Sequence, residues 1–220
     1  MLSSEVKAIV FDAYGTLFDV QSLTQRLQQH FGDQASAINQ IWRQKQLQYT
    51  WLRALMQRYQ PFSQVTMDAL SFACEASGQA LREAQKQDLL DCYYAISAYQ
   101  QVQEAIPGLA ERFPLAVLSN ADEAMLGAAL RNAQLERHFT HVLSVDQVQC
   151  YKPDPRVYQL AVDAFGLTPQ QICFVSSNTW DVAGAKSFGF QVAWLDHHDG
   201  TQDHLEQPAD YLIKNVSNLK

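Results

Sequence analysis

Short and almost entirely apolar runs recur along the chain and constrain its fold more than any other feature. Such runs lie at residues 8–11, 115–118, 141–145, 172–175 and 191–195. They do not alternate apolar with polar residues, which is typical of parallel strands covered on both faces. Helical patterns separate them, as at residues 155–165, which Asp154 and Gly166 flank as capping residues. We therefore expect an α/β fold with a doubly wound parallel sheet.

The segment between about residues 22 and 97 interrupts this alternation. It contains no convincing strand and instead carries long amphipathic patterns rich in Gln, such as residues 38–60 and 66–77. We interpret it as an all-helical insertion placed directly after the first strand and its loop. The expected division is a core of residues 1–20 and 98–220 and a helical domain of residues 21–97.

Composition excludes several classes of protein. The net charge of -7 and the absence of a Lys and Arg cluster argue against a nucleic-acid partner, and a small molecule is the expected one. The four cysteines form no CxxC pair and have no neighbouring His, so buried reduced thiols are expected rather than a zinc site. The first residues contain neither a spanning helix nor a signal peptide, which favours a cytoplasmic protein without a membrane partner.

Polar side chains follow the predicted strands where each strand ends. Asp12 follows the first strand, in VFDAYGT. The others are Ser119 and Asn120 in VLSNAD, Lys152 in CYKPDP, and Ser176, Asn178 and Asp181 in FVSSNTWD. Because the carboxyl ends of the strands in a doubly wound sheet meet at one crevice, these groups are expected to converge. The sequence therefore predicts a reactive site at this crevice, made of two carboxylates, an ammonium, two amides and two hydroxyls.

The order of these motifs resembles the haloacid dehalogenase superfamily and, within it, the L-2-haloacid dehalogenases. The motifs D-x-Y-G-T, S-N, K-P and S-S-N-x-W-D extend over nearly the whole chain. The general motifs also occur in phosphatases, whereas SSNTWD and the segment WRQKQLQYTWLR, residues 42–53, are narrower signals. The resemblance implies a HAD-like, Rossmann-type core, with the helical insertion as a cap domain. It also implies a homodimer.

Tyr14 stands where phosphatases of this superfamily carry a second Asp that protonates the leaving alcohol. A halide needs no proton, because it is the conjugate base of a very strong acid. Tyr14 therefore fits cleavage of a carbon–halogen bond, and Asp12 is expected to be the nucleophile. The implied reaction hydrolyses short L-2-haloalkanoic acids to D-2-hydroxy acids through an aspartyl ester, with inversion at C2.

The resemblance also assigns roles to the residues around Asp12. Asp181 would activate the water that attacks the ester, and Lys152 would hold the two carboxylates in their ionised form. Ser176 and Asn178 would orient these carboxylates. Lys152 could alternatively be a surface lysine in a Lys-Pro turn, and Ser176 and Asn178 could simply bond the local backbone where their strand ends.

The leaving halide and the substrate carboxylate each need a partner. By the resemblance, the halide cradle is Arg43, Asn120 and Trp180, although an Arg in an amphipathic helix is usually a solvated residue. Ser119 and the backbone N–H groups after Asp12 would bind the carboxylate.

Several further residues have both a site role and an ordinary structural one. Thr16 would hydrogen-bond Asp12, or would cap the following helix. Tyr158 resembles a site tyrosine of the family, and a core position is an equal alternative. The predicted apolar pocket wall is Tyr14, Gln44, Leu47, Phe62 and Trp180. Aromatic residues at helical spacing are more often ordinary core, which applies to Leu47 and Phe62 in particular.

No metal and no other cofactor is expected. Phosphatase relatives bind magnesium between two acids, whereas this chain has Ser-Ser-Asn where they often have Gly-Asp, and Lys152 would hold Asp12 without a metal. Asp12 and Asp181 could still bind magnesium weakly. Three alternatives stay open: a small-molecule phosphomonoesterase, an inactive binding protein on the same scaffold, and a fluoroacetate-directed hydrolase.

Overall fold

A parallel six-stranded sheet forms the centre of the computed structural model, which describes residues 2–197 and 199–219. The strand order is β3-β2-β1-β4-β5-β6, and every neighbouring pair is parallel. The strands are β1 Ala8–Phe11, β2 Leu115–Ser119, β3 His141–Ser144, β4 Ile172–Ser176, β5 Gln191–Leu195 and β6 Tyr211–Ile213. The predicted fold class is confirmed.

The first strand lies in the middle of the sheet. Val10 of β1 pairs with Ala116 of β2 on one side and with Phe174 of β4 on the other. All four residues of β1 are fully buried, which explains why the run is apolar without alternation. The predicted strands match β1 to β5 within a residue at each end. β6 was not predicted, because this edge strand has only three residues and exposes Leu212.

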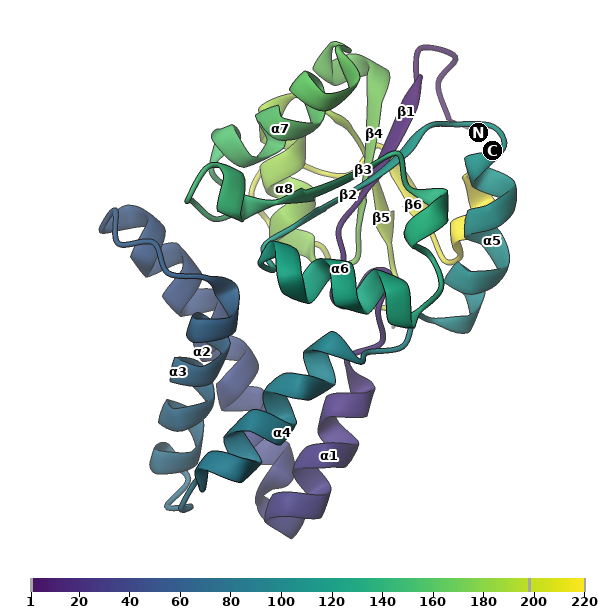
Figure 1. Ribbon diagram of the computed structural model, residues 1–220. Coiled ribbons are helices and arrows are strands. Elements are labelled where there is room, and N and C mark those ends of the chain that lie inside the picture. The colour runs from purple at the N-terminus through teal and green to yellow at the C-terminus, as the bar shows by residue number, and fades with distance from the viewer. Residues whose placement is uncertain (1, 198, 220) are drawn as a thin grey trace.

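Helices cover the sheet on both faces (Figure 1). The helices α7 (Pro155–Phe165) and α8 (Thr179–Phe188) lie on one side, and α5 (Gln100–Ala110) and α6 (Glu123–Asn132) lie on the other. The predicted ends of α7 are confirmed, since the Asp154 side chain accepts a hydrogen bond from the Arg156 N–H and Gly166 adopts a left-handed φ of 63°.

Four α-helices form the insertion between β1 and α5. They are α1 (Gln21–Phe31), α2 (Ala35–Leu55), α3 (Phe62–Ala76) and α4 (Glu83–Tyr94), and Figure 1 shows them extending away from the sheet. The predicted helical character of this segment is confirmed. The helix expected at 38–60 begins earlier and ends at Leu55, because the chain turns at Gln57, whose φ is 55°. The domain boundaries after residues 20 and 97 stay a prediction.

The second helix of the insertion buries one face at regular spacing. Ile38, Trp42, Gln46 and Thr50 are buried, each four residues after the last. This stripe packs against α3, whose buried residues include Val65 and Ala69. Arg43 and Leu47 therefore lie on the neighbouring face of the same helix.

All four cysteines are free. Cys74, Cys150 and Cys173 are buried and Cys92 is partly exposed, so the expectation of buried reduced thiols holds for three of them. Within the described part of the chain, no helix combines the length and the apolar character needed to cross a membrane.

Candidate active site

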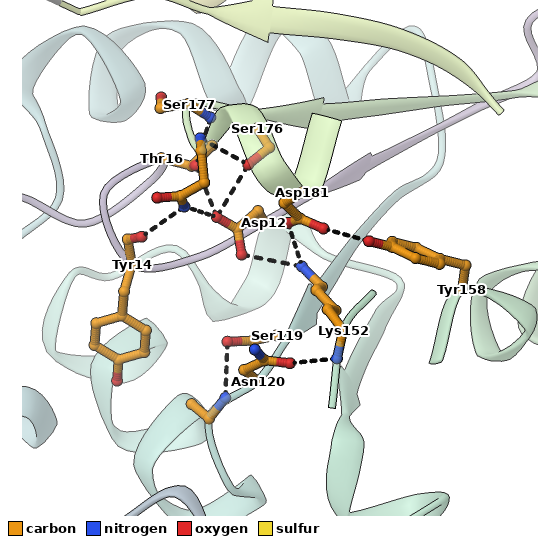
Figure 2. Close-up of polar contacts among 12 residues, drawn as sticks. Asp12, Tyr14, Thr16, Ser119, Asn120, Lys152, Tyr158, Ser176, Ser177 and Asp181 are labelled. Carbon is orange, nitrogen blue, oxygen red and sulfur yellow. Dashed lines mark hydrogen bonds and ion pairs between the residues drawn. The ribbon is translucent and has the colours of Figure 1, made fainter. Parts of the chain in front are cut away.

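Asp12 is held rigidly at the carboxyl end of β1 (Figure 2). Its N–H donates to the Val175 carbonyl at 2.9 Å, which continues the pairing of β1 with β4 by one residue. Three side chains donate to Oδ2: Thr16 at 2.9 Å, Asn178 at 2.8 Å and Ser176 at 3.3 Å. Among the described residues, Oδ1 accepts a hydrogen bond from Lys152 alone, at 3.0 Å. Oδ2 is therefore saturated, whereas Oδ1 retains a lone pair for chemistry.

Thr16 links the loop after β1 to the loop after β4. Its hydroxyl donates to Asp12 and accepts the Ser177 N–H at 2.9 Å. The alternative that Thr16 caps the following helix is wrong, because α1 begins at Gln21 and Val20 occupies its N-cap position. Ser176 fulfils both of its predicted roles. Its Oγ contacts Asp12, and it also accepts the Asn178 N–H at 3.1 Å in the turn where β4 ends.

Lys152 lies between the two carboxylates and is fully buried. Its ammonium donates to Asp12 at 3.0 Å and to Asp181 Oδ2 at 2.8 Å. The surface-lysine alternative is therefore wrong. Burial by itself lowers the pKa of Lys152, but the charges of Asp12 and Asp181 outweigh it and raise this pKa above its ordinary value. The ammonium stays charged and keeps the carboxylates paired.

Asp181 is fully buried behind Asp12 and has a second partner in Tyr158. The Tyr158 hydroxyl donates to Asp181 Oδ1 at 2.7 Å. Burial raises the pKa of Asp181 to about 6; the Lys152 charge opposes this effect and the Asp12 charge adds to it. The close approach of Tyr158 requires Gly184, where a Cβ would lie 2.5 Å from the hydroxyl oxygen. Tyr158 is thus both a core residue and a partner of the site.

Ser119 and Asn120 lie at the end of β2, facing the same region (Figure 2). The Ser119 hydroxyl accepts the Ala121 N–H at 3.1 Å, and the Asn120 side-chain oxygen accepts the Lys152 N–H at 3.0 Å. The amide oxygen of Asn120 is thus occupied. Its NH₂ group has no hydrogen bond to another described residue and is available as a donor.

A small cavity of about 40 Å³ lies between this end of the sheet and the helical insertion. Its lining residues are Asp12, Tyr14, Arg43, Gln46, Leu47, Phe62, Ser119, Asn120, Ala121, Asn178 and Trp180. Arg43, Leu47 and Phe62 reach it from α2 and α3, whereas Trp180 reaches it from α8. Thr16, Lys152, Tyr158, Ser176 and Asp181 do not line the cavity but lie in the network behind Asp12.

The prediction that Gln44 lines this wall requires a correction. Gln44 is exposed, and Gln46 is buried and contributes to the lining instead. Successive helical residues are rotated by about 100°, so only one face of α2 reaches the cavity. Gln46 and Ala121 were not predicted. The four-residue spacing of the buried stripe on α2 was the signal that could have identified Gln46.

Arg43 and Trp180 both line the cavity and both carry N–H donors. Arg43 comes from the insertion and, within the residues that the structure describes, forms no ion pair. The indole N–H of Trp180 is buried and has no hydrogen-bond partner among the described residues. A buried donor without a partner is costly unless a ligand satisfies it.

The charges around Asp12 disfavour a metal between the carboxylates. The Lys152 ammonium pairs with both Asp12 and Asp181 and so already offsets part of the negative charge that would attract a cation. Throughout residues 2–197 and 199–219, no group of three or more His, Cys, Asp or Glu side chains is arranged to hold a metal ion.

Comparison with known proteins places the chain in a family. The model of the haloacid dehalogenase-like hydrolases matches residues 6–189, so the chain belongs to this family of hydrolases. The resemblance to L-2-haloacid dehalogenases is also confirmed. An (S)-2-haloacid dehalogenase of Pseudomonas sp. (strain YL) is 42% identical over 96% of this chain and 91% of its own length. One from Pseudomonas putida is 39% identical over 97% of this chain and 95% of its own.

A solved structure agrees with these relatives. The L-2-haloacid dehalogenase from Xanthobacter autotrophicus, with chloropropionic acid covalently bound, superposes with a TM-score of 0.92 at 35% identity. The match covers 97% of this chain and 96% of that chain.

Proposed function

We propose that the protein hydrolyses short L-2-haloalkanoic acids to D-2-hydroxy acids, with inversion at C2, through an ester on Asp12. The observation that carries this proposal is the pair of Asp12 and Tyr14 at the cavity. The Tyr14 hydroxyl donates to the Tyr93 carbonyl at 3.1 Å, and burial raises the pKa of Tyr14 well above its ordinary value. Tyr14 is therefore unsuited to protonate an alcohol, and the site suits a leaving group that departs as an anion.

In the first step, Asp12 Oδ1 attacks C2 of the substrate in line with the carbon–halogen bond. The new C–O bond forms as the halide leaves with the bonding electrons, which inverts C2. The donors on Oδ2 hold the carboxylate in one rotamer, and this lowers the entropic cost of reaching the attacking geometry. Arg43, Asn120 and the unpartnered indole N–H of Trp180 stabilise the developing halide charge.

In the second step, water attacks the ester carbonyl carbon while Asp181 accepts one of its protons. The bond between Asp12 and the product oxygen then breaks, and the proton held by Asp181 passes to this oxygen, so the product leaves as an alcohol. The other proton of the water is released to solvent as the Asp12 carboxylate re-forms beside Lys152. C2 does not react again, so the inverted configuration is retained in the product.

The substrate carboxylate binds at Ser119 and the backbone N–H groups that follow Asp12. The small cavity favours substrates with a short alkyl group against Tyr14, Leu47 and Phe62. Residues 21–97 act as a cap that supplies Arg43 to a site built on residues 1–20 and 98–220.

We also infer a homodimer, for which the end of α2 offers an apolar surface. Leu55 is 81% exposed and Met56 is 59% exposed. Large exposed apolar side chains next to each other favour burial against another chain.

The direct test is halide release from L-2-chloropropionate by purified protein in EDTA, with the D enantiomer in parallel. Release from the L form alone, unchanged by EDTA, is the expected result. Absence of release from both forms, together with magnesium-dependent phosphate release from phosphate esters, would instead identify a phosphomonoesterase. Inactivity on both substrate classes would leave a binding protein on this scaffold.

Hydrolysis of the ester is expected to slow as the pH falls below about 6. Asp181 accepts a proton only when ionised, and burial, with a contribution from the Asp12 charge, raises its pKa to about 6. In the ester Asp12 is neutral and burial remains, so the base is present above this pH and is lost at or below it. The rate should fall about tenfold for each pH unit well below the pKa. Rapid-quench measurement of ester decay between pH 4.5 and 8 checks this. A rate that stays constant down to pH 4.5 would rule out Asp181 as the base.

A further inference from the structure

A buried glutamine in the helical insertion has no part in the steps above. Gln46 of α2 is 1% exposed, yet its side chain is polar and lines the reaction cavity. Burial of an amide is unfavourable unless its donors and its acceptor are satisfied. The partners of Gln46 therefore indicate what this side chain does.

Two hydroxyl groups from the neighbouring helices fix the amide. Its Nε2 donates to Thr66 Oγ1 of α3 at 2.7 Å and to Tyr93 Oη of α4 at 3.1 Å. Both N–H bonds are thus used, which determines the orientation of the amide. Trp42 holds the same turn of α3, since its indole N–H donates to the Thr66 carbonyl at 2.9 Å. Three helices of the insertion consequently position one side chain.

The amide oxygen, held in this orientation, faces Arg43. Arg43 Nη1 donates to Gln46 Oε1 at 3.4 Å, and the Tyr93 hydroxyl lies at the same distance from this oxygen. A neutral amide oxygen satisfies a guanidinium N–H without cancelling its positive charge. A carboxylate in its place would form a charge-assisted ion pair and compete with an incoming anion.

We propose that Gln46 is a positioning residue, anchored by Thr66 and Tyr93, that orients the Arg43 guanidinium toward the leaving halide while leaving its charge free. This inference rests on the proposed role of Arg43 in the dehalogenation. Gln46 itself does not touch the reacting atoms, and it acts through Arg43.

The test compares single-turnover rates of Gln46→Met on L-2-chloropropionate and L-2-bromopropionate. Gln46→Met keeps the side-chain length but removes the hydrogen bond to Arg43. A misoriented guanidinium is expected to lower the rate of ester formation about 10-fold to 100-fold. The loss should be larger for chloride, the poorer leaving group, while KM changes little. Gln40→Met is the matched control, since Gln40 is exposed on the same helix, and it should change neither rate.

Arg43→Lys and the Arg43→Lys/Gln46→Met double variant separate this inference from the proposed function. If Gln46 acts through Arg43, Gln46→Met should have little further effect once Arg43 is replaced. An equal loss in both backgrounds, or equal losses for the two halides, would overturn the positioning role alone. An Arg43→Lys enzyme with unchanged rates would overturn the role of Arg43 as well.

Gln46→Glu keeps the test decisive if Gln46→Met does not fold. The added carboxylate pairs with Arg43 and offsets its charge. The rate of ester formation at neutral pH should therefore fall, and by more for the chloride than for the bromide substrate. A variant that is as active as the wild type at neutral pH would contradict the inference.

Discussion

Replacing Asp12 with Asn is expected to reduce halide release by at least about 10⁴-fold, because an amide is a very weak nucleophile. Asn has nearly the same shape, and Lys152 keeps its second partner Asp181, so the fold should persist. Halide release measured with an ion-selective electrode gives the activity. Circular dichroism and urea unfolding check that the variant is folded. Full retained activity would exclude the covalent mechanism.

Isotope labelling tests the same nucleophile without a mutation. In a single turnover with enzyme in excess and H₂¹⁸O as solvent, water attacks the ester carbonyl carbon, so the label should enter the Asp12 carboxylate. The oxygen in the product then comes from unlabelled Asp12. Mass spectrometry of the peptide that contains Asp12 measures the incorporation. Label found only in the hydroxy acid would show that water attacks C2 directly.

Replacing Lys152 with Met is expected to lower the free energy of unfolding by about 3–5 kcal/mol, because it leaves buried carboxylates without their cation. The ammonium is fully buried and pairs with Asp12 and Asp181 at once. The loss should be smaller at pH 5 than at pH 8. The pKa of Asp181 is already raised to about 6, and without the Lys152 charge it rises further, so the variant loses stability as the pH rises through this range. Urea unfolding at both pH values measures this.

A surface pair provides the matched control for this variant. Lys186 and Asp210 form an ion pair at 2.6 Å, with side chains 30% and 32% exposed. Exposed pairs contribute about 0–1 kcal/mol, so Lys186→Met should change the unfolding free energy by less than 1 kcal/mol. Similar losses for both variants would mean that burial does not govern the Lys152 pair.

Much of the site follows from where each polar residue stands relative to a strand. Asp12 and Asp181 are far apart in the chain, and Lys152 lies between them in sequence, yet all three were expected together. The ends of parallel strands meet at one edge of the sheet, so topology brings them together regardless of sequence separation. The ion pairs among the three residues bear out this convergence.

The face that each helix presents could not be predicted as well. Gln44 and Gln46 are both glutamines in one amphipathic helix, and either could follow Arg43 toward a pocket. The choice depends on the rotation of α2 against α3, which buries the stripe that contains Gln46. The role of Thr16 was similarly ambiguous, between a bond to Asp12 and a cap of the following helix. The contact between its hydroxyl and the Ser177 N–H, in the loop after β4, depends on tertiary structure.

The amino-acid sequence by itself determined the parallel α/β core, the helical insertion and the residues that meet at Asp12. Apolar runs mark the strands locally, and the topology of a parallel sheet then brings the residues at the strand ends together. Only the tertiary structure decided the three-residue strand β6, the burial of Lys152 between two carboxylates and the contact of Gln46 with Arg43. These features depend on packing between segments distant in sequence, where an ångström of displacement or a small rotation of a helix changes which atoms meet.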